Sequence, residues 1–275
     1  MRRLRRSSTS IVLVVVAMMW IVPTIGLMVT ALRPQAESAR SGWWRVFVEP
    51  SQLTLDNFVE IITSDFFGRS IINTFAITVP ATAAVVIIGA LAAYAFAWIA
   101  FPGRDALFVG IVGLLVVPLQ MALVPVARLY GTLGIFGSIL GVVLFHAAFG
   151  LPFAIFLLRN FFAGIPKELL EAARLDGASE ASIFFRVILP LGVPAIASLA
   201  IFQFLWVWND LLVALVFART STAPITVAIQ QQLRQFGGNL DIISAASFVS
   251  MVIPLVVFFA FQRHFAQGLL AGSVK

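Results

Sequence analysis

The sequence predicts an all-α integral membrane protein with six transmembrane helices. Of its 275 residues, 61% are hydrophobic and only 11% are charged, which leaves too little polar surface for a soluble globular domain. A membrane-spanning helix takes about 20 mostly apolar residues, and kinks are expected where such a run contains Pro118, Pro125 or Pro194. The predicted spans are 11–32, 71–99, 106–127, 138–160, 192–217 and 243–262.

The first apolar run follows an arginine cluster, as the core of a cleaved secretory signal also does. A signal core has about 7 to 15 apolar residues and is followed by a small-residue cleavage site. The run 11–32 is longer, and no convincing cleavage site follows it. We therefore expect a retained helix.

Basic residues predict the orientation, because cytoplasmic connections carry an excess of Lys and Arg. Arg2, Arg3, Arg5 and Arg6 precede the first span, and with the N-terminus inside, the inner segments carry more basic residues than the outer ones. Both termini are therefore expected in the cytoplasm. The predicted organisation is a basic N-terminus 1–10, a first transmembrane helix 11–32, an outer loop 33–70, a transmembrane core 71–262 that includes a cytoplasmic loop 164–191, and a cytoplasmic tail 263–275.

The outer loop contains a predicted amphipathic helix. Leu55, Phe58, Val59 and Ile62 recur at helical spacing behind Thr54, which is a suitable cap. The helix either contacts an external binding protein or covers the helix bundle. Apolar helical stripes generally pack, so the pattern favours the second interpretation.

Several function classes are excluded by what the sequence lacks. There is no Cys, and only His146 and His264 remain as imidazole ligands, so we expect no metal site. The two lysines, Lys167 and Lys275, stand in no Gly-Lys-Ser/Thr motif, so this chain is not expected to hydrolyse ATP or to carry a cofactor. The scattered arginines build no basic stripe for nucleic acid. His146 is expected to be a packed, hydrogen-bonding residue.

The predicted cytoplasmic loop, 164–191, has the pattern of helix, turn and helix. Pro166 suits a first helical position, Gly177 provides a left-handed stop, and Ser179 can cap a second helix that ends at Pro190. Leu169, Ala172 and Ala173 are expected on one face of the first helix. Such a loop is either an interfacial helix pair or a docking element for a soluble partner.

The loop resembles the EAA loop of ABC importer permeases. Glu171-Ala172-Ala173, then Gly177, then Val187-Ile188-Leu189-Pro190 match that motif in residue type and spacing, with Val187 in place of the usual Ile. The resemblance implies coupling helices that sit in a cleft on an ATPase subunit, which would hold ATP and magnesium. The coupling residues that it implies are Glu171, Ala172, Ala173, Gly177, Leu189 and Pro190.

Three further stretches resemble the carbohydrate branch of these permeases, of the maltose and maltodextrin type. They are Gly89–Ala97 with Phe101-Pro102-Gly103-Arg104, then Phe204–Leu215, and the C-terminal Phe261–Lys275. Where the family often has a basic residue before the Phe-Pro-Gly turn, this chain has Trp98-Ile99-Ala100. Ser41-Gly42-Trp43-Trp44 and the Leu-Ala-Gly-Ser-Val-Lys ending are similar to α-glucoside permeases in particular.

The fifth predicted span carries a polar pair, Asn209 and Asp210, inside or close to the hydrocarbon, where an Asp needs a partner in the bundle interior. These residues, with Trp206 and Trp208, either line the sugar pathway or fix helix packing. The tail resembles one that reaches the interface between ATPase subunits. The tail residues that the resemblance assigns to an ATPase contact are Gln262, Arg263, Gly268 and Gly272.

The function that these resemblances imply is the permease subunit of an ATP-driven ABC importer for sugars or oligosaccharides in the bacterial inner membrane. Such a subunit forms half of the translocation pathway and couples to the ATPase through loop 166–190. Its partners would be an ATPase dimer, a second permease, an external substrate-binding protein and the lipid bilayer. The alternative is an ion-coupled secondary transporter of small polar solutes, which usually carries charges in several spans, whereas Asp210 is nearly alone here.

Overall fold

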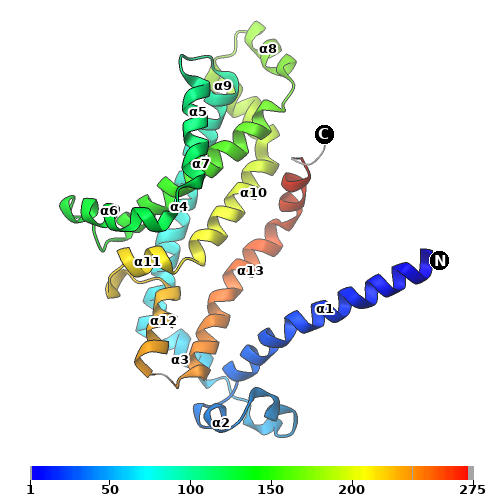
Figure 1. The fold of residues 1–275 in the computed structure, drawn as a ribbon, viewed down its shortest axis with the longest axis vertical. Helices are drawn as coiled ribbons and strands as arrows, with labels where there is room; N and C mark the ends of the chain where they lie inside the picture. The colour runs from blue at the N-terminus through cyan, green and yellow to red at the C-terminus, as the bar shows by residue number, and fades with distance from the viewer. Residues whose placement is uncertain (1, 237, 272–275) are drawn as a thin grey trace. The chain divides into compact units, whose positions relative to one another are not determined.

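The computed structural model describes the backbone of residues 2–236 and 238–271 and the side chains of residues 10–233 and 238–261. Within these ranges the chain is helical and has no β-strand. The helices are α1 (Arg2–Ala31), α2 (Gln35–Arg40), α3 (Asp56–Thr63), α4 (Asp65–Trp98), α5 (Arg104–Gly113), α6 (Leu119–Thr132), α7 (Ile139–Ala163), α8 (Lys167–Leu175), α9 (Glu180–Ile183), α10 (Leu189–Trp208), α11 (Leu212–Phe217), α12 (Ile225–Phe236) and α13 (Leu240–Ala271) (Figure 1).

The chain divides into two compact units. The first comprises Met1–Ile71 and Val227–Ile253, and the second comprises Ile72–Thr226 and Pro254–Lys275. In the second unit, α8 and α9 lie at one end of α7 and α10, and α11 lies near the other end (Figure 1).

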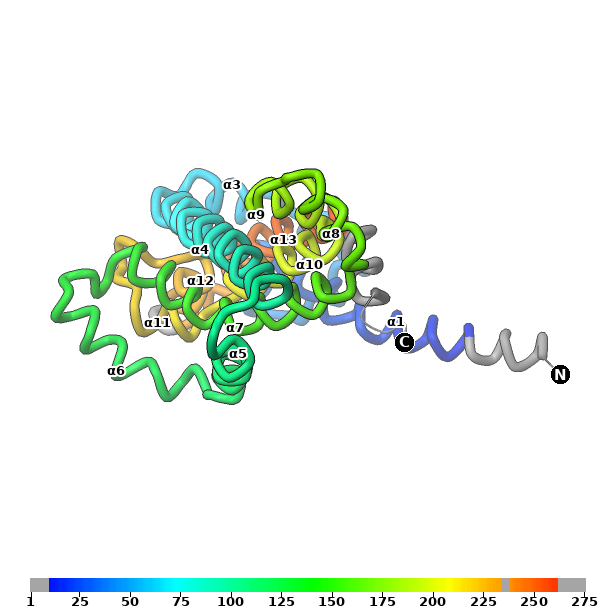
Figure 2. The backbone as a smooth tube through the Cα atoms, turned by 90° about the horizontal axis from the view of Figure 1, so that it is seen from above, coloured from blue at the N-terminus to red at the C-terminus, as the bar shows by residue number. Residues whose placement is uncertain are grey.

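Five helical segments in the described residues are long and apolar enough to cross a membrane, and a bent pair adds up to one more. The bent pair, Arg104–Val116 and Leu119–Thr132, corresponds to the third predicted span but turns by 100° at Pro118 (Figure 2). Pro118 has no N–H to donate to a helix, which explains a break there. The other five segments are Ser10–Ala31, Asp65–Trp98, Ile139–Ala163, Glu180–Trp208 and Leu240–Phe261.

The segment Glu180–Trp208 corresponds to the predicted span 192–217 and differs from it at both ends. The helix does not end at Pro190, because a π-helical turn, Phe184–Ile188, joins α9 to α10. In this turn Leu189 donates its N–H to the carbonyl of Phe184, five residues back, and the altered register accommodates the proline. At the other end the helix stops at Trp208, so the predicted span 192–217 is broken before α11.

The second unit is held by close helix packing. Ala90, Ala93 and Tyr94 of α4 share an apolar core with Leu158 and Phe162 of α7 and with residues of α10. Gly89 allows α4 and α7 to approach closely, because a Cβ atom there would lie 2.8 Å from the Cβ of Ala154. This packing sets the positions of α4, α7 and α10 relative to one another.

The first unit is organised around buried Arg33. Arg33 as a whole is 1% exposed. Its guanidinium donates hydrogen bonds to the backbone carbonyls of Glu37, Ser41 and Gly42 and to the side chain of Gln52. A cation buried in this way is stabilised by the acceptors that surround it.

The helix predicted within residues 33–70 is present as α3. Its packed face, however, carries Asn57 and Ile61, whereas Leu55, Val59 and Ile62 are 65%, 55% and 70% exposed. Most of the predicted stripe is therefore exposed, and only Phe58 is half-buried.

Candidate functional site

The loop between α7 and α10 folds as helix, turn and helix, as the sequence predicts. α8 begins directly after Pro166. Gly177 in the turn has a φ of +79°, which other residues adopt at a cost of about 1 kcal/mol. The Ser179 hydroxyl then accepts the backbone N–H of Ser182 at 3.3 Å and caps α9.

α8 has a buried face and an exposed face. Leu170 is 1% exposed and belongs to the core that includes α4 and α7 residues, against which Ala173 also packs. Leu169 and Leu175 are 46% and 89% exposed, and Ala172 is exposed between them. Ala173 therefore faces inward rather than outward with Leu169 and Ala172. Exposed apolar residues gathered on one helix are typical of an interaction site.

The predicted coupling residues fall into two groups. Glu171, beside Lys167 at 3.7 Å, and Gly177 are exposed on the loop together with Ala172. Leu189 and Pro190 instead lie in the first turn of α10, inside a continuous helix, and Leu189 packs against the core. The structure thus gathers residues 171–177 on the loop and leaves the other two in the span.

A three-residue network that the sequence did not predict joins this loop to α4. The Tyr94 hydroxyl donates a hydrogen bond to Oε2 of Glu180, the first residue of α9. Arg174 of α8 donates to the same carboxylate through Nε, 2.9 Å from Oε1, and through Nη2, 3.3 Å from Oε2. The hydrogen bond with Glu180 raises the pKa of Arg174 further, so the guanidinium stays charged. The one hint of this network in the sequence was a tyrosine, Tyr94, within the run of small residues Gly89–Ala97.

Trp98 fixes the end of α4 beside this network. Its indole Nε1 donates to the Phe162 carbonyl of α7 at 3.1 Å, and its own carbonyl accepts Nη2 of Arg174 at 3.5 Å. Trp98 stands where the resemblance described above would place a basic residue, and it bonds instead to α7 and to the loop.

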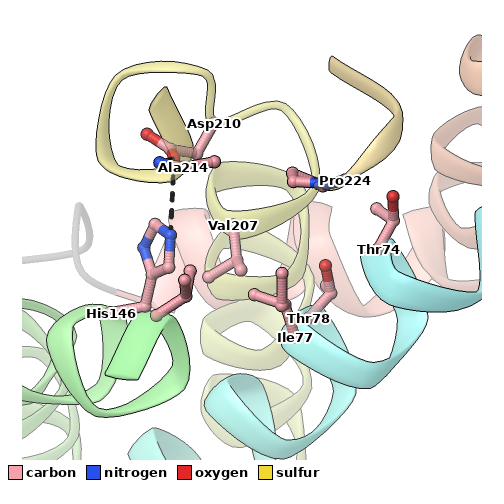
Figure 3. A pocket seen from close by; sticks show the side chains of 9 residues that line it. Thr74, Ile77, Thr78, His146, Val207, Asp210, Ala214 and Pro224 are labelled. Atoms are coloured by element: carbon pink, nitrogen blue, oxygen red, sulfur yellow. Dashed lines mark hydrogen bonds and ion pairs between the residues drawn. The ribbon is translucent and has the colours of Figure 1, made fainter. Parts of the chain in front are cut away.

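Asp210, at the break between α10 and α11, makes several polar contacts, of which Figure 3 marks the one with His146. Its Oδ1 accepts the N–H of Val213 at 3.3 Å and its Oδ2 that of Ala214 at 3.1 Å, so the carboxylate caps α11. His146 of α7 lies opposite, with Nε2 3.5 Å from Oδ2. The Thr226 hydroxyl donates to the Asp210 carbonyl at 2.6 Å. These contacts favour the interpretation that Asp210 fixes packing.

A small cavity adjoins this pair. Its volume is about 10 Å³, close to what one water molecule needs. Thr78 in its wall is 0% exposed, and its hydroxyl has no hydrogen-bond partner among the described side chains. The cavity is lined by Thr74, Ile77, Thr78, Val142, His146, Val207, Asp210, Ala214 and Pro224 (Figure 3).

A larger groove of about 350 Å³ lies between α7 and α10. Gln203 in its wall is 3% exposed, and its Nε2 atom has no partner in the part of the chain that the structure describes. Gly150 makes room for this amide, because a Cβ there would lie 2.7 Å from Gln203 Oε1. The lining residues are Phe149, Gly150, Phe153, Phe202, Gln203 and Trp206.

Among the four predicted pathway residues, only Trp206 lines this groove. Its ring meets His146 edge to face at 5.2 Å, which ties it to the Asp210 cluster. Trp208 is 1% exposed and packs against Phe75 and Phe204. Asn209 is exposed and donates to the Leu205 carbonyl at 2.8 Å.

The predicted tail contacts cannot be placed with their side chains. Gln262, Arg263 and Gly268 belong to the α13 helix, but their side chains lie outside the described residues, and Gly272 lies outside them entirely.

Comparison with known proteins agrees with the helical architecture and the loop. Residues 65–270 match the family described as binding-protein-dependent transport system inner membrane component. The chain is 48% identical over 270 residues to the osmoprotective compounds uptake permease protein GgtD of Synechocystis sp., covering 96% of this chain and 91% of that one. It is 51% identical over 233 residues to the α-glucoside transport system permease protein AglG of Rhizobium meliloti, covering 82% and 61% respectively.

A solved structure supports the fold. A chain of a bacterial ABC transporter involved in the import of the acidic polysaccharide alginate superposes with a TM-score of 0.81 at 22% identity, covering 96% of each chain. The chain therefore belongs to the family of binding-protein-dependent transport system inner membrane components, the multi-pass permease subunits of ABC importers.

Proposed function

We propose that this permease imports sugars or oligosaccharides. The observation that carries the proposal is the groove between α7 and α10, where the rings of Phe153, Phe202 and Trp206 surround a buried amide, Gln203. Aromatic faces suit the C–H faces of a pyranose, and an amide can bond its hydroxyl groups. An unpaired amide is also costly against lipid, so the groove is better matched to a polar solute. The Rhizobium relative is an α-glucoside transport system permease protein, which supports the same class of substrate.

A second candidate substrate is an osmoprotective solute, because the Synechocystis relative carries that description and covers more of the chain. The two candidates are separated by uptake into proteoliposomes that hold the complete transporter. Competition by α-glucosides but not by glycine betaine supports sugar import. Competition by glycine betaine but not by α-glucosides would show that the substrate is an osmoprotectant and not a sugar.

The loop 166–190 is the proposed contact with the ATPase. The support is the exposed surface of Leu169, Ala172 and Leu175 around Glu171, held on a loop that is itself anchored through buried Leu170. The partner ATPase would supply ATP and magnesium. A second permease would complete the pathway, and an external binding protein would deliver the sugar.

The proposed topology counts the bent pair as one span, which gives six spans with both termini in the cytoplasm of the inner membrane. The loop then lies on the cytoplasmic side, as contact with an ATPase requires. The chain has no Cys, so Glu171→Cys introduces a single thiol, whose labelling shows on which side of the membrane the loop lies. Labelling by an impermeant maleimide in inverted vesicles, but not in intact spheroplasts, is the expected result.

The energy source separates this proposal from ion-coupled transport. We expect uptake to stop when ATP is depleted and to continue when the proton gradient is collapsed. Uptake that follows the proton gradient instead would contradict an ATP-driven mechanism.

A further inference from the structure

The carboxylate of Glu180 joins two elements that have different roles. On one side it receives Arg174 of α8, the helix proposed to contact the ATPase. On the other side it receives the hydroxyl of Tyr94, which lies one turn before the end of the long helix α4. Tyr94 and Glu180 are separated by 86 residues, so this bond joins distant parts of the chain.

The two halves of the network differ in burial. The side chains of Arg174 and Glu180 are 39% and 47% exposed, and they belong to the same loop, so their pairing stabilises the turn. Tyr94 is 5% exposed and is packed in the core, with its ring 5.3 Å from that of Phe184. The hydroxyl is therefore a fixed point in the span to which the loop carboxylate is attached.

A second contact attaches the loop at the same place. Arg174 also donates to the carbonyl of Trp98, and the Trp98 indole is bonded to α7 through the Phe162 carbonyl. A displacement of α8 would thus be carried to the ends of both α4 and α7. Packed helices transmit such displacements because their interfaces do not deform continuously.

We propose that Tyr94 is a positioning residue for energy coupling: by holding the Glu180 carboxylate, it makes α8 and the end of α4 move together when the ATPase moves α8. The proposal rests on the proposed contact between α8 and the ATPase. It assigns a role to the Gly89–Ala97 stretch beyond close helix packing. Tyr94 acts through Glu180 and contacts neither ATP nor substrate.

The decisive variant is Tyr94→Phe, which removes the hydroxyl and keeps the ring that packs against Phe184. Its matched control is Tyr130→Phe, because Tyr130 is also buried, at 7% exposed, and is the other tyrosine of the chain. Both variants are tested in the complete transporter, reconstituted with its ATPase, second permease and external binding protein. The readouts are ATPase co-purification, ATP hydrolysis and sugar taken up per ATP hydrolysed.

For Tyr94→Phe we expect normal co-purification and hydrolysis, with uptake per ATP reduced about tenfold, the effect of losing one hydrogen bond to a charged acceptor. Tyr130→Phe should match the parent protein. Unchanged uptake per ATP in Tyr94→Phe would overturn the proposal, and so would loss of the ATPase, because the hydroxyl would then serve docking rather than transmission.

A charge swap provides a rescue test that simple misfolding would not pass. Arg174→Glu and Glu180→Arg each break the network, whereas the double variant restores an ion pair of reversed polarity. The Tyr94 hydroxyl can then accept a hydrogen bond from the guanidinium introduced at position 180, since a phenol is both donor and acceptor. We expect the double variant to recover part of the uptake per ATP, because Arg174→Glu still removes the donor to the Trp98 carbonyl, and to lose this recovery when Tyr94→Phe is added. Recovery that is indifferent to Tyr94→Phe would overturn the role of the hydroxyl.

Failure of the proposed docking is recognised separately. If Gly177→Trp leaves ATPase binding and uptake intact, α8 does not contact the ATPase and the proposed function of the loop is wrong. If Gly177→Trp releases the ATPase while Tyr94→Phe leaves uptake per ATP unchanged, only the role of Tyr94 is wrong.

Discussion

His146 on α7 lies with its Nε2 atom 3.5 Å from Oδ2 of Asp210, the residue at which the fifth predicted span breaks. The same oxygen accepts the N–H of Ala214 and so caps α11. One carboxylate therefore holds a helix start and a neighbouring span, which gives it a structural role that can be measured.

Asp210→Ala should destabilise the protein, because it leaves α11 without its cap and His146 without its partner. Loss of a helix cap alone costs about 1 kcal/mol. We expect a lower thermal midpoint in detergent, with Asp210→Asn intermediate because its amide oxygen can still accept one N–H. The control is Asn209→Ala, since Asn209 is exposed. Equal midpoints for Asp210→Ala and Asn209→Ala would show that the contacts of Asp210 contribute nothing to stability.

Trp206→Ala should weaken sugar uptake by removing an aromatic face from the groove between α7 and α10. We expect KM to rise about tenfold, the upper range for an aromatic contact, while Trp206→Phe has a smaller effect. Phe156→Ala is the matched control, because Phe156 is 37% exposed on α7 and is absent from the groove lining. If both alanine variants change KM equally, the groove has no special part in binding the sugar.

Gly150→Ala should be destabilising, because the added Cβ would lie 2.7 Å from Gln203 Oε1 and 2.9 Å from Val85 Cγ2. Overpacking of this kind costs about 1–3 kcal/mol. Gly110→Ala, where no atom lies within 4 Å of the added Cβ, should be neutral or slightly stabilising. Thermal unfolding of the two purified variants measures the difference, and a stable Gly150→Ala would mean that the amide is free to move away.

Gly177→Trp should release the ATPase. Apart from its two chain neighbours, no described residue has an atom within 4 Å of a Cβ at Gly177, so the bulky side chain would obstruct the partner rather than the loop. Gly103→Trp is the matched control, because Gly103 has a φ of +78° and open space as well. Because both glycines have a positive φ, the two substitutions strain the backbone to a similar extent. The amount of ATPase that co-purifies with each variant is the measurement. Equal retention of the ATPase in both would contradict docking at the loop.

Local chemistry was sufficient to predict the loop. Pro166, Gly177 and Ser179 each act through their own backbone or the next turn, so helix, turn and helix could be predicted without knowing the fold. The same reasoning was wrong at Pro190, because a π-helical turn several residues earlier absorbs the proline. Pro118 predicted a kink in the third span, but the sequence could not reveal its angle of 100° or the end of α10 at Trp208.

Long-range contacts could not be predicted from the sequence. The bond between Tyr94 and Glu180 and the pairing of His146 with Asp210 depend on how α4, α7 and α10 pack. The groove was missed for the same reason, since Phe153 and Gln203 belong to different helices and neither stands in a recognisable motif. Trp206 was predicted because its stretch resembles that of related permeases, and its orientation came only from the structure.

Cross-linking from Leu175 tests the docking of the loop most directly. Leu175 is 89% exposed on α8, and the chain contains no Cys, so Leu175→Cys supplies a single site for a photoactivatable maleimide. In membranes that contain the complete transporter, we expect this probe to cross-link to the ATPase subunit and the yield to change on addition of ATP. Val116→Cys, 82% exposed at the bend before α6, should give no such product. Absence of an ATPase cross-link from Leu175→Cys, or equal yields from both positions, would contradict docking of the ATPase on the loop.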